Sequence, residues 1–467
     1  MLVAFFTTPV LADAADIFGT ETQIPATPTA PMGIAPDICQ VNSLPVPLTL
    51  PAAVDRALCA SPKTRSAWLA IKSAAAVVGQ STAAYLPTLT ASAQYNRQHY
   101  DTRVADEPDL QSGFASSVNT ESVSLSWVLY DFGGRAASLK GSRALLAAAR
   151  ATETFVLQST FSNAAKDYYA AQAALAKVES AGRFKVTARQ SLDAATARVS
   201  KGVAPITDQL QTDTALAQTI YDLAKAESDY RTALGTLAID MGSEPDEPLR
   251  LPGMDGGVLP DTEFVRAVHE LVEEAQRTHP SVAAAEAQWQ AALAKVSAVR
   301  AQGLPTVSLQ AEADRSNQPI SASLGQPEFP AVTHNNYVGV KVTIPLFEGF
   351  DREYLIRQAQ ADARQQEQSL RDTQQQIALG VWSSFETLQA ATENLHNTDA
   401  ILQSAQRAFD AIQHRYSAGV GSILEVLSVQ KNLATAEQQR IQAQLDWRTA
   451  RLQLAASLGQ LGMWALE

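Results

Sequence analysis

Side chains able to do chemistry are few in this chain of 467 residues, and its six histidines are scattered. His269-Glu270 begins like the zinc-binding motif of metalloproteases but lacks the second histidine. Gly419-Val420-Gly421 lacks the third glycine of a dinucleotide-binding loop. Neither a Gly-x-Ser-x-Gly elbow nor a P-loop occurs. The sequence therefore predicts no enzyme, no cofactor and no metal site, and any energy must come from a partner.

Two cysteines, Cys39 and Cys59, remain. The apolar run Leu2–Ala12 ends in small residues like a secretory signal, although no basic residues precede it; a disordered apolar tail is the alternative. An exported protein meets an oxidising compartment, in which a cysteine pair tends to form a disulfide. A bridge would close a loop of about 20 residues and stabilise the fold by roughly 3 kcal/mol. Two unrelated thiols are the alternative.

The composition of the chain limits the classes of partner that it is expected to bind. The net charge of −12 argues against nucleic acid. Beyond the first residues, no stretch approaches the ~18 to 20 apolar residues of a membrane-spanning helix, so any membrane-spanning part would be built of strands. The Pro/Thr/Ala-rich stretch Thr20–Pro36 is expected to be a solvated leader.

A long internal repeat is the strongest signal. Leu86-Pro87-Thr88 recurs as Leu304-Pro305-Thr306, and the Arg198–Val203 segment recurs as Arg415–Val420. The offset between matching positions stays at about 217 residues, which predicts two copies of one structural unit. Further pairs hold nearly the same register: Ser61 with His279, Ile206 with Ile423, Asp208 with Glu425, and Gly242 with Gly459.

Hydrophobic residues alternate in two segments of each copy, which predicts strands of about ten residues, enough to cross a bilayer when tilted. The segments are 89–96, 122–129, 307–313 and 338–344, with polar hairpin loops near 101–117 and 315–335. A half-buried sheet of a soluble domain is the alternative, but it would need another element to cover its apolar face.

Long helical segments follow each pair of strands. Gly134–Lys201 and Arg352–Ala418 contain no proline, and their hydrophobic residues recur every seven positions, as in a coiled coil. Each turns at a glycine, Gly202 or Gly419, and returns as a second helix. The returning helices are expected at 206–241 and 423–458, and shorter helices before the strands at 50–84 and 264–302.

These elements predict the domain organisation. The expected parts are a signal peptide (1–12), a leader (13–47), a first repeat (48–242), an equatorial linker (243–263), a second repeat (264–459) and a C-terminal tail (460–467). Four strands cannot close a membrane barrel, because the smallest barrels have about eight strands and an open edge is not viable in lipid. Several chains are therefore expected to pool their strands.

In combination, these features resemble the TolC family of outer-membrane factors, also called the outer membrane efflux protein family, from Leu48 to Gly459. The motifs that carry the resemblance are the strand exits Leu129–Gly134 and Leu346–Gly349, and the helical turns Gly202–Asp208 and Tyr416–Glu425. The resemblance implies a mixed α+β membrane protein that forms a homotrimer. Its shared twelve-stranded β-barrel is then expected in the bacterial outer membrane and its long helical tunnel in the periplasm. The trimer is expected to dock on a periplasmic adaptor joined to an inner-membrane pump, driven by ATP or by protons.

The resemblance also implies site residues at the turns. Asp208 and Tyr416 match a closing bond network, and Glu425 matches an acid of the constriction. Gly421 and Ser428 stand where the family has an arginine and a second acid. Like charges around a three-fold axis would recruit cations. The alternative for Asp208 and Glu425 is a solvated acid that favours a helix N-terminus.

Two further implications concern the turns and the cargo. Gly202, Val203, Gly419 and Val420 match adaptor-contacting tips, although they also serve as helix caps. The function implied is a passive exit duct for small-molecule efflux or type I protein secretion. Ala57–Pro62, with a second cysteine upstream, resembles the CyaE-like branch of type I secretion. The alternatives are a periplasmic coiled-coil scaffold or adaptor without a channel, and a lone pore.

Overall fold

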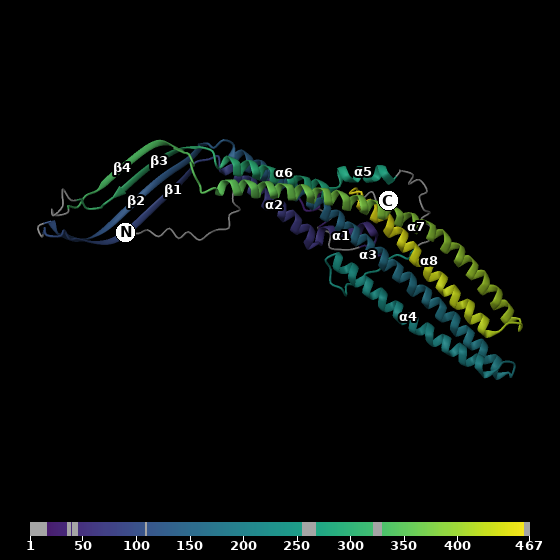
Figure 1. Ribbon diagram of the computed structural model, residues 1–467. Coiled ribbons are helices and arrows are strands. Elements are labelled where there is room, and N and C mark those ends of the chain that lie inside the picture. The colour runs from purple at the N-terminus through teal and green to yellow at the C-terminus, as the bar shows by residue number, and fades with distance from the viewer. Residues whose placement is uncertain are drawn as a thin grey trace. The chain divides into compact units, whose positions relative to one another are not determined.

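The computed structural model describes residues 16–34, 39, 45–107, 110–254, 268–320 and 329–461. The expected signal segment, 1–12, lies outside these residues, as do parts of the expected linker and tail. The described residues form long helices and one antiparallel sheet (Figure 1). Among them, no helix is long and apolar enough to cross a membrane. Two compact units are distinguished: unit 1 holds Met1–Ile24, Lys72–Ala147 and Ala287–Gln368, and unit 2 holds Pro25–Ile71, Ala148–Glu286 and Ser369–Glu467.

The sheet has four strands in the order β1-β2-β3-β4. Their bounds are Thr88–Thr102 for β1, Ser112–Tyr130 for β2, Thr306–Ser316 for β3 and Thr333–Thr343 for β4. All four predicted strands are confirmed. The expected length of about ten residues is wrong for the first hairpin, since β1 has 15 residues and β2 has 19. Its loop is correspondingly shorter, because ladder hydrogen bonds continue past the point where the hydrophobic alternation fades.

The register of the strands places apolar residues opposite each other across the whole sheet. Leu89 pairs with Leu125, Leu125 with Ala311, and Ala311 with Val338. Since side chains alternate between faces, this row gives one face an apolar character and leaves serines, threonines and acids on the other. Within one chain the outer members of this row are exposed, with Leu89 71% and Val338 76% accessible, and Leu125 and Ala311 are half-buried. Strands β1 and β4 are the edges of this sheet.

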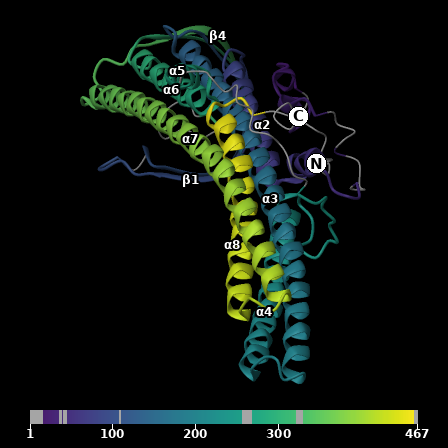
Figure 2. The ribbon, with the colours of Figure 1, turned by 90° about the vertical axis from the view of Figure 1, so that its right-hand side faces the viewer.

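The long helices occur in two pairs of equal length. Helices α3 (Gly134–Ser200) and α7 (Asp351–Ser417) each have 67 residues. Helices α4 (Ile206–Asp240) and α8 (Ile423–Ser457) each have 35 residues. All four begin and end within one residue of the predicted limits, so these predictions are confirmed. In Figure 2, α8 returns alongside α7.

The two shorter helices were expected to be continuous, and this prediction is wrong. The first is divided into α1 (Leu50–Ala60) and α2 (Pro62–Ala83), and the second into α5 (Val268–Thr278) and α6 (Pro280–Ala301). Proline disfavours the helical conformation at the preceding residue, so each helix ends before Pro62 or Pro280. At the first break, the Thr64 hydroxyl donates to the carbonyl oxygens of Leu58 at 3.0 Å and Ser61 at 2.8 Å.

The largest core lies in unit 2, where α1, α3 and α4 meet. Phe161 and Leu58 are fully buried there, and the Tyr168 hydroxyl donates to the Leu48 carbonyl at 2.9 Å. The described part of the expected linker joins this core through Leu249 and Leu251. This described part of the linker is therefore packed against α1, α3 and α4.

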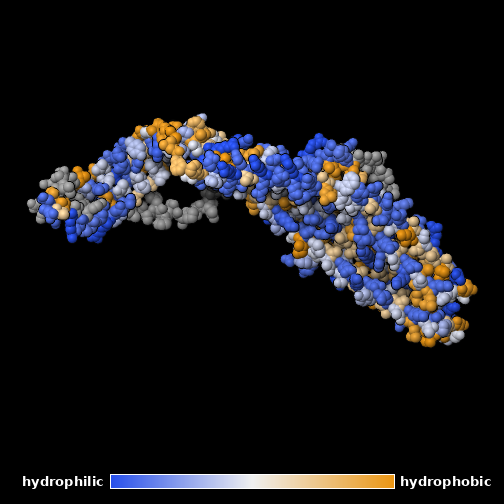
Figure 3. Space-filling model, viewed as in Figure 1, coloured by the Kyte–Doolittle hydropathy of each residue, from blue (hydrophilic) through white to orange (hydrophobic). Residues whose placement is uncertain are grey.

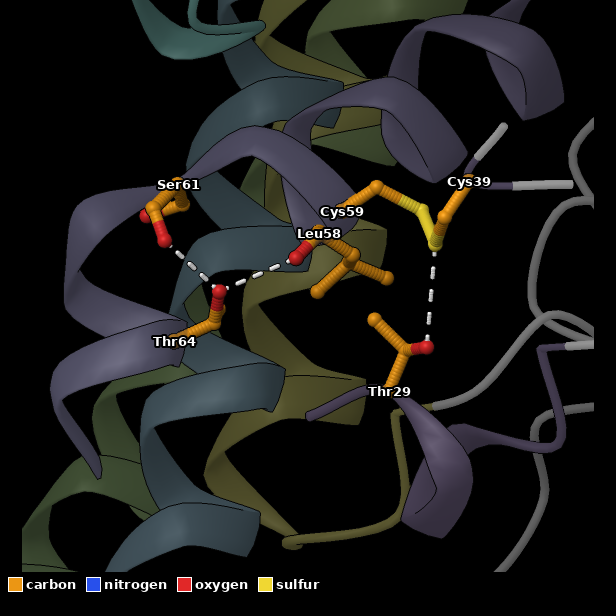
Figure 4. Close-up of a disulfide and its surroundings, with 6 residues drawn as sticks. All are labelled: Thr29, Cys39, Leu58, Cys59, Ser61 and Thr64. Atoms are coloured by element: carbon orange, nitrogen blue, oxygen red, sulfur yellow. Dashed lines mark hydrogen bonds between the residues drawn. A yellow bond between two sulfur atoms is a disulfide. The ribbon is translucent and has the colours of Figure 1, made fainter. Parts of the chain in front are cut away.

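The expectation of a solvated leader is wrong for its described part. This segment forms the short 3-10 helices η1 (Thr20–Gln23) and η2 (Ala30–Met32). Thr29 is 1% exposed, and the Trp68 indole donates to the Pro25 carbonyl at 2.9 Å. A disulfide joins Cys39 to Cys59 of α1, and the Thr29 hydroxyl lies 3.9 Å from the Cys39 sulfur (Figure 4).

Candidate constriction at the helical turns

The first turn, between α3 and α4, is closed by a left-handed glycine. Gly202 has φ 71°, its N–H donates to the Val199 carbonyl at 3.0 Å, and the Val203 N–H donates to the Arg198 carbonyl at 3.0 Å. This is the Schellman arrangement, which satisfies the last carbonyls of a helix and favours glycine. Helix α4 then restarts after Pro205, with Asp208 in its first turn.

The second turn, between α7 and α8, repeats this geometry. Gly419 has φ 84°, and the Val420 N–H donates to the Arg415 carbonyl at 3.1 Å. The Ser422 hydroxyl caps α8 by accepting from the Leu424 N–H at 3.2 Å. Glu425 lies in the first turn of α8, where an acid interacts favourably with the helix dipole.

One side-chain contact joins the ends of the two hairpins. The Arg198 guanidinium, at the end of α3, donates from Nη1 to the Tyr416 carbonyl oxygen at 3.0 Å. Its Cζ also lies 4.8 Å from the centre of the Tyr416 ring. Tyr416 is 8% exposed and packs against Ile423 and Val426. Arg198 therefore holds the ring by a cation–π contact and the backbone by a charged hydrogen bond.

The Tyr416 hydroxyl takes no part in this contact. Its oxygen is buried and has no hydrogen-bond partner. Among the described residues, neither Asp208 nor Glu425 forms a hydrogen bond or ion pair with Tyr416; Asp208 is half-buried and Glu425 is exposed. The structure thus brings Tyr416 together with Arg198, a residue noted in the sequence only as part of the repeat. The signal that could have singled it out was its position four residues before the turn glycine in both copies.

Gly421 has a steric role in the second turn. A Cβ at this position would lie 2.9 Å from the Tyr416 backbone nitrogen and 3.2 Å from its Cα. Such a contact with backbone atoms cannot be relieved by a side-chain rotation, so any other residue would displace the turn. The departure from the family's arginine therefore fits this turn conformation.

The tips expose apolar side chains. Val203 is 65% and Val420 69% accessible, and Ile206, Leu210 and Leu424 are also exposed. Figure 3 shows hydrophobic surface at the ends of the helical hairpins. Because a folded chain seldom leaves several large apolar residues together in water, such a surface indicates a site of interaction with another protein.

Polar side chains of α3 and α8 form hydrogen bonds and an ion pair with one another at some distance from the turns. The Glu437 carboxylate accepts from Arg183 at 2.8 Å and from the Ser180 hydroxyl. Further from the turn, Arg448 donates to the Gln172 side chain at 3.2 Å. The two hairpins of unit 2 are therefore joined by hydrogen bonds and ion pairs together with an apolar cluster, in which Phe184 of α3 packs against Phe409 of α7 and Leu433 of α8.

Unit 2 also holds acids that the sequence did not single out. Glu153 of α3 is 1% exposed, one of its carboxylate oxygens has no partner, and burial raises its pKa to about 7. Burial, together with a hydrogen bond that the protonated Asp167 donates to Asp240 and the negative charge of Asp240, raises the pKa of Asp167 to about 7. Both acids lie far along α3 from the turns.

Comparison with known proteins agrees with this architecture. The family model described as "Outer membrane efflux protein" matches residues 53–243 and 271–460. The chain belongs to this family of outer-membrane channels, which are the exit ducts of bacterial export systems. It is thus an outer-membrane efflux protein with its helical part in the periplasm.

Its relatives include Protein CyaE of Bordetella pertussis, which is 31% identical over 90% of this chain and 86% of that protein. The pyoverdine export outer membrane protein OpmQ of Pseudomonas aeruginosa is 26% identical over 89% of this chain and 85% of that protein. Among solved structures, the outer membrane protein VceC of Vibrio cholerae has the same fold, with a TM-score of 0.74 and 19% identity over 88% of this chain and 96% of VceC.

Proposed function

We propose that this chain is one subunit of a homotrimeric channel-tunnel that passively conducts cargo from a pump to the cell exterior. The open four-stranded sheet with its exposed apolar row carries the proposal. Two unpaired edges are unstable in lipid, whereas three chains that join β1 to β4 of the next would close twelve strands. The apolar row would then face lipid and the polar row the lumen.

The proposal includes an internal duplication. The pairs α3 and α7, and α4 and α8, have equal lengths, and the two turns share one capping geometry. Two equivalent hairpins from each of three chains would form a helical tunnel of six similar units. The two repeats of this proposal are the predicted ones, 48–242 and 264–459.

The exposed tips support docking to a periplasmic adaptor that is joined to an inner-membrane pump. Gly202, Val203, Gly419 and Val420 present an apolar surface at the far end of unit 2. The chain itself acts as a duct and not as an enzyme, because the energy for transport is supplied by the pump. Type I protein secretion is the more specific proposal, supported by the similarity to CyaE over most of the chain.

The primary experiment is single-channel recording from the purified protein in a planar bilayer, with its mass in detergent determined in parallel. A trimer with a small, steady conductance is expected. A soluble monomer or dimer without conductance would instead favour a periplasmic scaffold or adaptor.

Ion selectivity tests the constriction. Three copies of Glu425 around one axis would attract cations, so Glu425→Ala should lower cation preference and weaken block by divalent cations. Glu425→Asp keeps the charge and serves as the control. Unchanged selectivity in Glu425→Ala would mean that Glu425 is only a solvated acid at the start of α8.

A further inference from the structure

We infer that Arg198 is the clamp that holds the α7–α8 hairpin against the α3–α4 hairpin and keeps the tunnel end closed, through the carbonyl and ring of Tyr416 rather than through its hydroxyl. The gating part of this inference rests on the proposed function. The contact itself does not, because it is a property of one chain.

The Tyr416 side chain is contacted from two helices besides its own. Ile423 and Val426 pack against Tyr416 from the start of α8, and the Arg198 guanidinium lies over the ring from α3. Tyr416 belongs to α7, so this one side chain is held by three helices. Removing Arg198 would leave the ring attached to its own hairpin alone at this level.

The Arg198 guanidinium makes two contacts with Tyr416 at once. Arg198 uses its Nη1 for the Tyr416 carbonyl at 3.0 Å while its plane covers the ring at 4.8 Å. Because Tyr416 lies in the last turn of α7, its carbonyl is one of the terminal helix carbonyls, which carry the negative end of the helix dipole. A cation at this place therefore stabilises the helix end as well as the contact between the hairpins.

Neither the Tyr416 hydroxyl nor the second turn supplies this contact. The buried Tyr416 hydroxyl has no partner, and Asp208 forms no hydrogen bond or ion pair with it. Gly421 leaves no room for a turn arginine, because a Cβ there would lie 2.9 Å from the Tyr416 backbone nitrogen. The positive charge that joins the hairpins is thus supplied by α3 and not by the turn itself.

The clamp can be tested on the full-length protein with spin labels at Val203→Cys and Val420→Cys, both exposed tip positions. The native cysteines are joined in a disulfide and do not compete for the label. Distances measured by pulsed electron resonance should broaden and lengthen in Arg198→Gln. Arg198→Lys should lie between this variant and the wild type, because lysine keeps a donor but cannot stack as a plane.

Two comparisons make the test specific. Tyr416→Phe should keep the wild-type distance, since only an unpartnered hydroxyl is removed. Arg189→Gln removes a positive charge from the same helix, where the Arg189 guanidinium lies 3.4 Å from Asp193 of α3 itself, so it should also leave the distance unchanged. Gly421→Ala should also lengthen the distance between the labels, because its Cβ would displace the Tyr416 backbone while Arg198 stays intact.

Channel recordings test whether the Arg198 contact controls opening, separately from whether the protein conducts at all. Arg198→Gln should raise the open probability about tenfold or more, whereas Arg189→Gln should not. An unchanged tip distance in Arg198→Gln, or an equal change in Tyr416→Phe, would overturn the clamp while leaving the duct intact. A longer tip distance in a protein that never conducts would instead uphold the clamp and refute the proposed function.

Discussion

Gly242→Ala is the substitution whose effect the structure specifies most closely. Gly242 follows α4 in the left-handed conformation, with φ 72°. An alanine Cβ there would lie 2.6 Å from the Cβ of Ala60, the last residue of α1. Non-polar carbon atoms normally approach to ~3.5–4.0 Å, so one of the two backbones must move. The glycine is thus required by both its conformation and its neighbour.

The expected cost has two parts. A non-glycine residue in the left-handed region costs about 1–2 kcal/mol. Overpacking against a rigid helix end costs about 1–3 kcal/mol more. Gly202→Ala is the matched control, because Gly202 is also a helix-ending glycine, with φ 71°, but nothing lies within 4 Å of its added Cβ. The control should show only the first part.

The assay is the midpoint of thermal loss of helical circular dichroism, recorded in detergent at one heating rate. Gly242→Ala should lower the midpoint clearly more than Gly202→Ala. Adding Ala60→Gly to Gly242→Ala should recover part of the loss, since it removes the other overlapping Cβ. Equal shifts for Gly242→Ala and Gly202→Ala, with no recovery in the double variant, would refute the steric argument.

Three further perturbations follow from unit 2. Replacing Cys39 and Cys59 by serine should cost roughly 3 kcal/mol, because the bridge closes a loop of about 20 residues; a reductant should lower the thermal midpoint of the wild type but not of this variant. Burial raises the pKa of Glu153 from 4.5 to about 7, so the folded state binds the proton more tightly and stability should fall as the pH rises from about 4.5 to about 7. Glu153→Gln should therefore raise the midpoint at pH 8 and not at pH 4, and an equal effect at both would contradict the burial argument. Gly459→Ala should resemble Gly242→Ala, since its Cβ would lie 2.8 Å from Pro280 Cδ; a shift no larger than that of Gly202→Ala would contradict this equivalence.

Pattern in the sequence alone determined the element types and the limits of the long helices. Period-two alternation identified all four strands, and the absence of proline together with the seven-residue repeat placed α3 and α7 to within one residue. These signals are local, because each depends only on the side chains that a short segment of helix or strand places on one face. The turn glycines, Gly202 and Gly419, were visible for the same reason.

Tertiary structure decided which residues meet. Sequence comparison paired Gly242 with Gly459 and Ser61 with His279, but only packing shows that each glycine lies against a break between two helices, with Gly242 against Ala60 and Gly459 against His279. The leader was expected to be solvated because its composition is rich in proline, threonine and alanine. Its described part is instead held by a disulfide and by a hydrogen bond to a backbone carbonyl, which composition does not report.

The helical turns show most clearly the difference between what the sequence predicts and what packing decides. Resemblance directed attention to Asp208, Tyr416 and Glu425, whose types suggest a bond network. The structure places a cation from a different helix over Tyr416 and leaves its hydroxyl without a partner. A residue's type and its distance along the chain say which bonds it is able to form. Which of them it forms depends on the packing of helices that lie more than 200 residues apart in sequence.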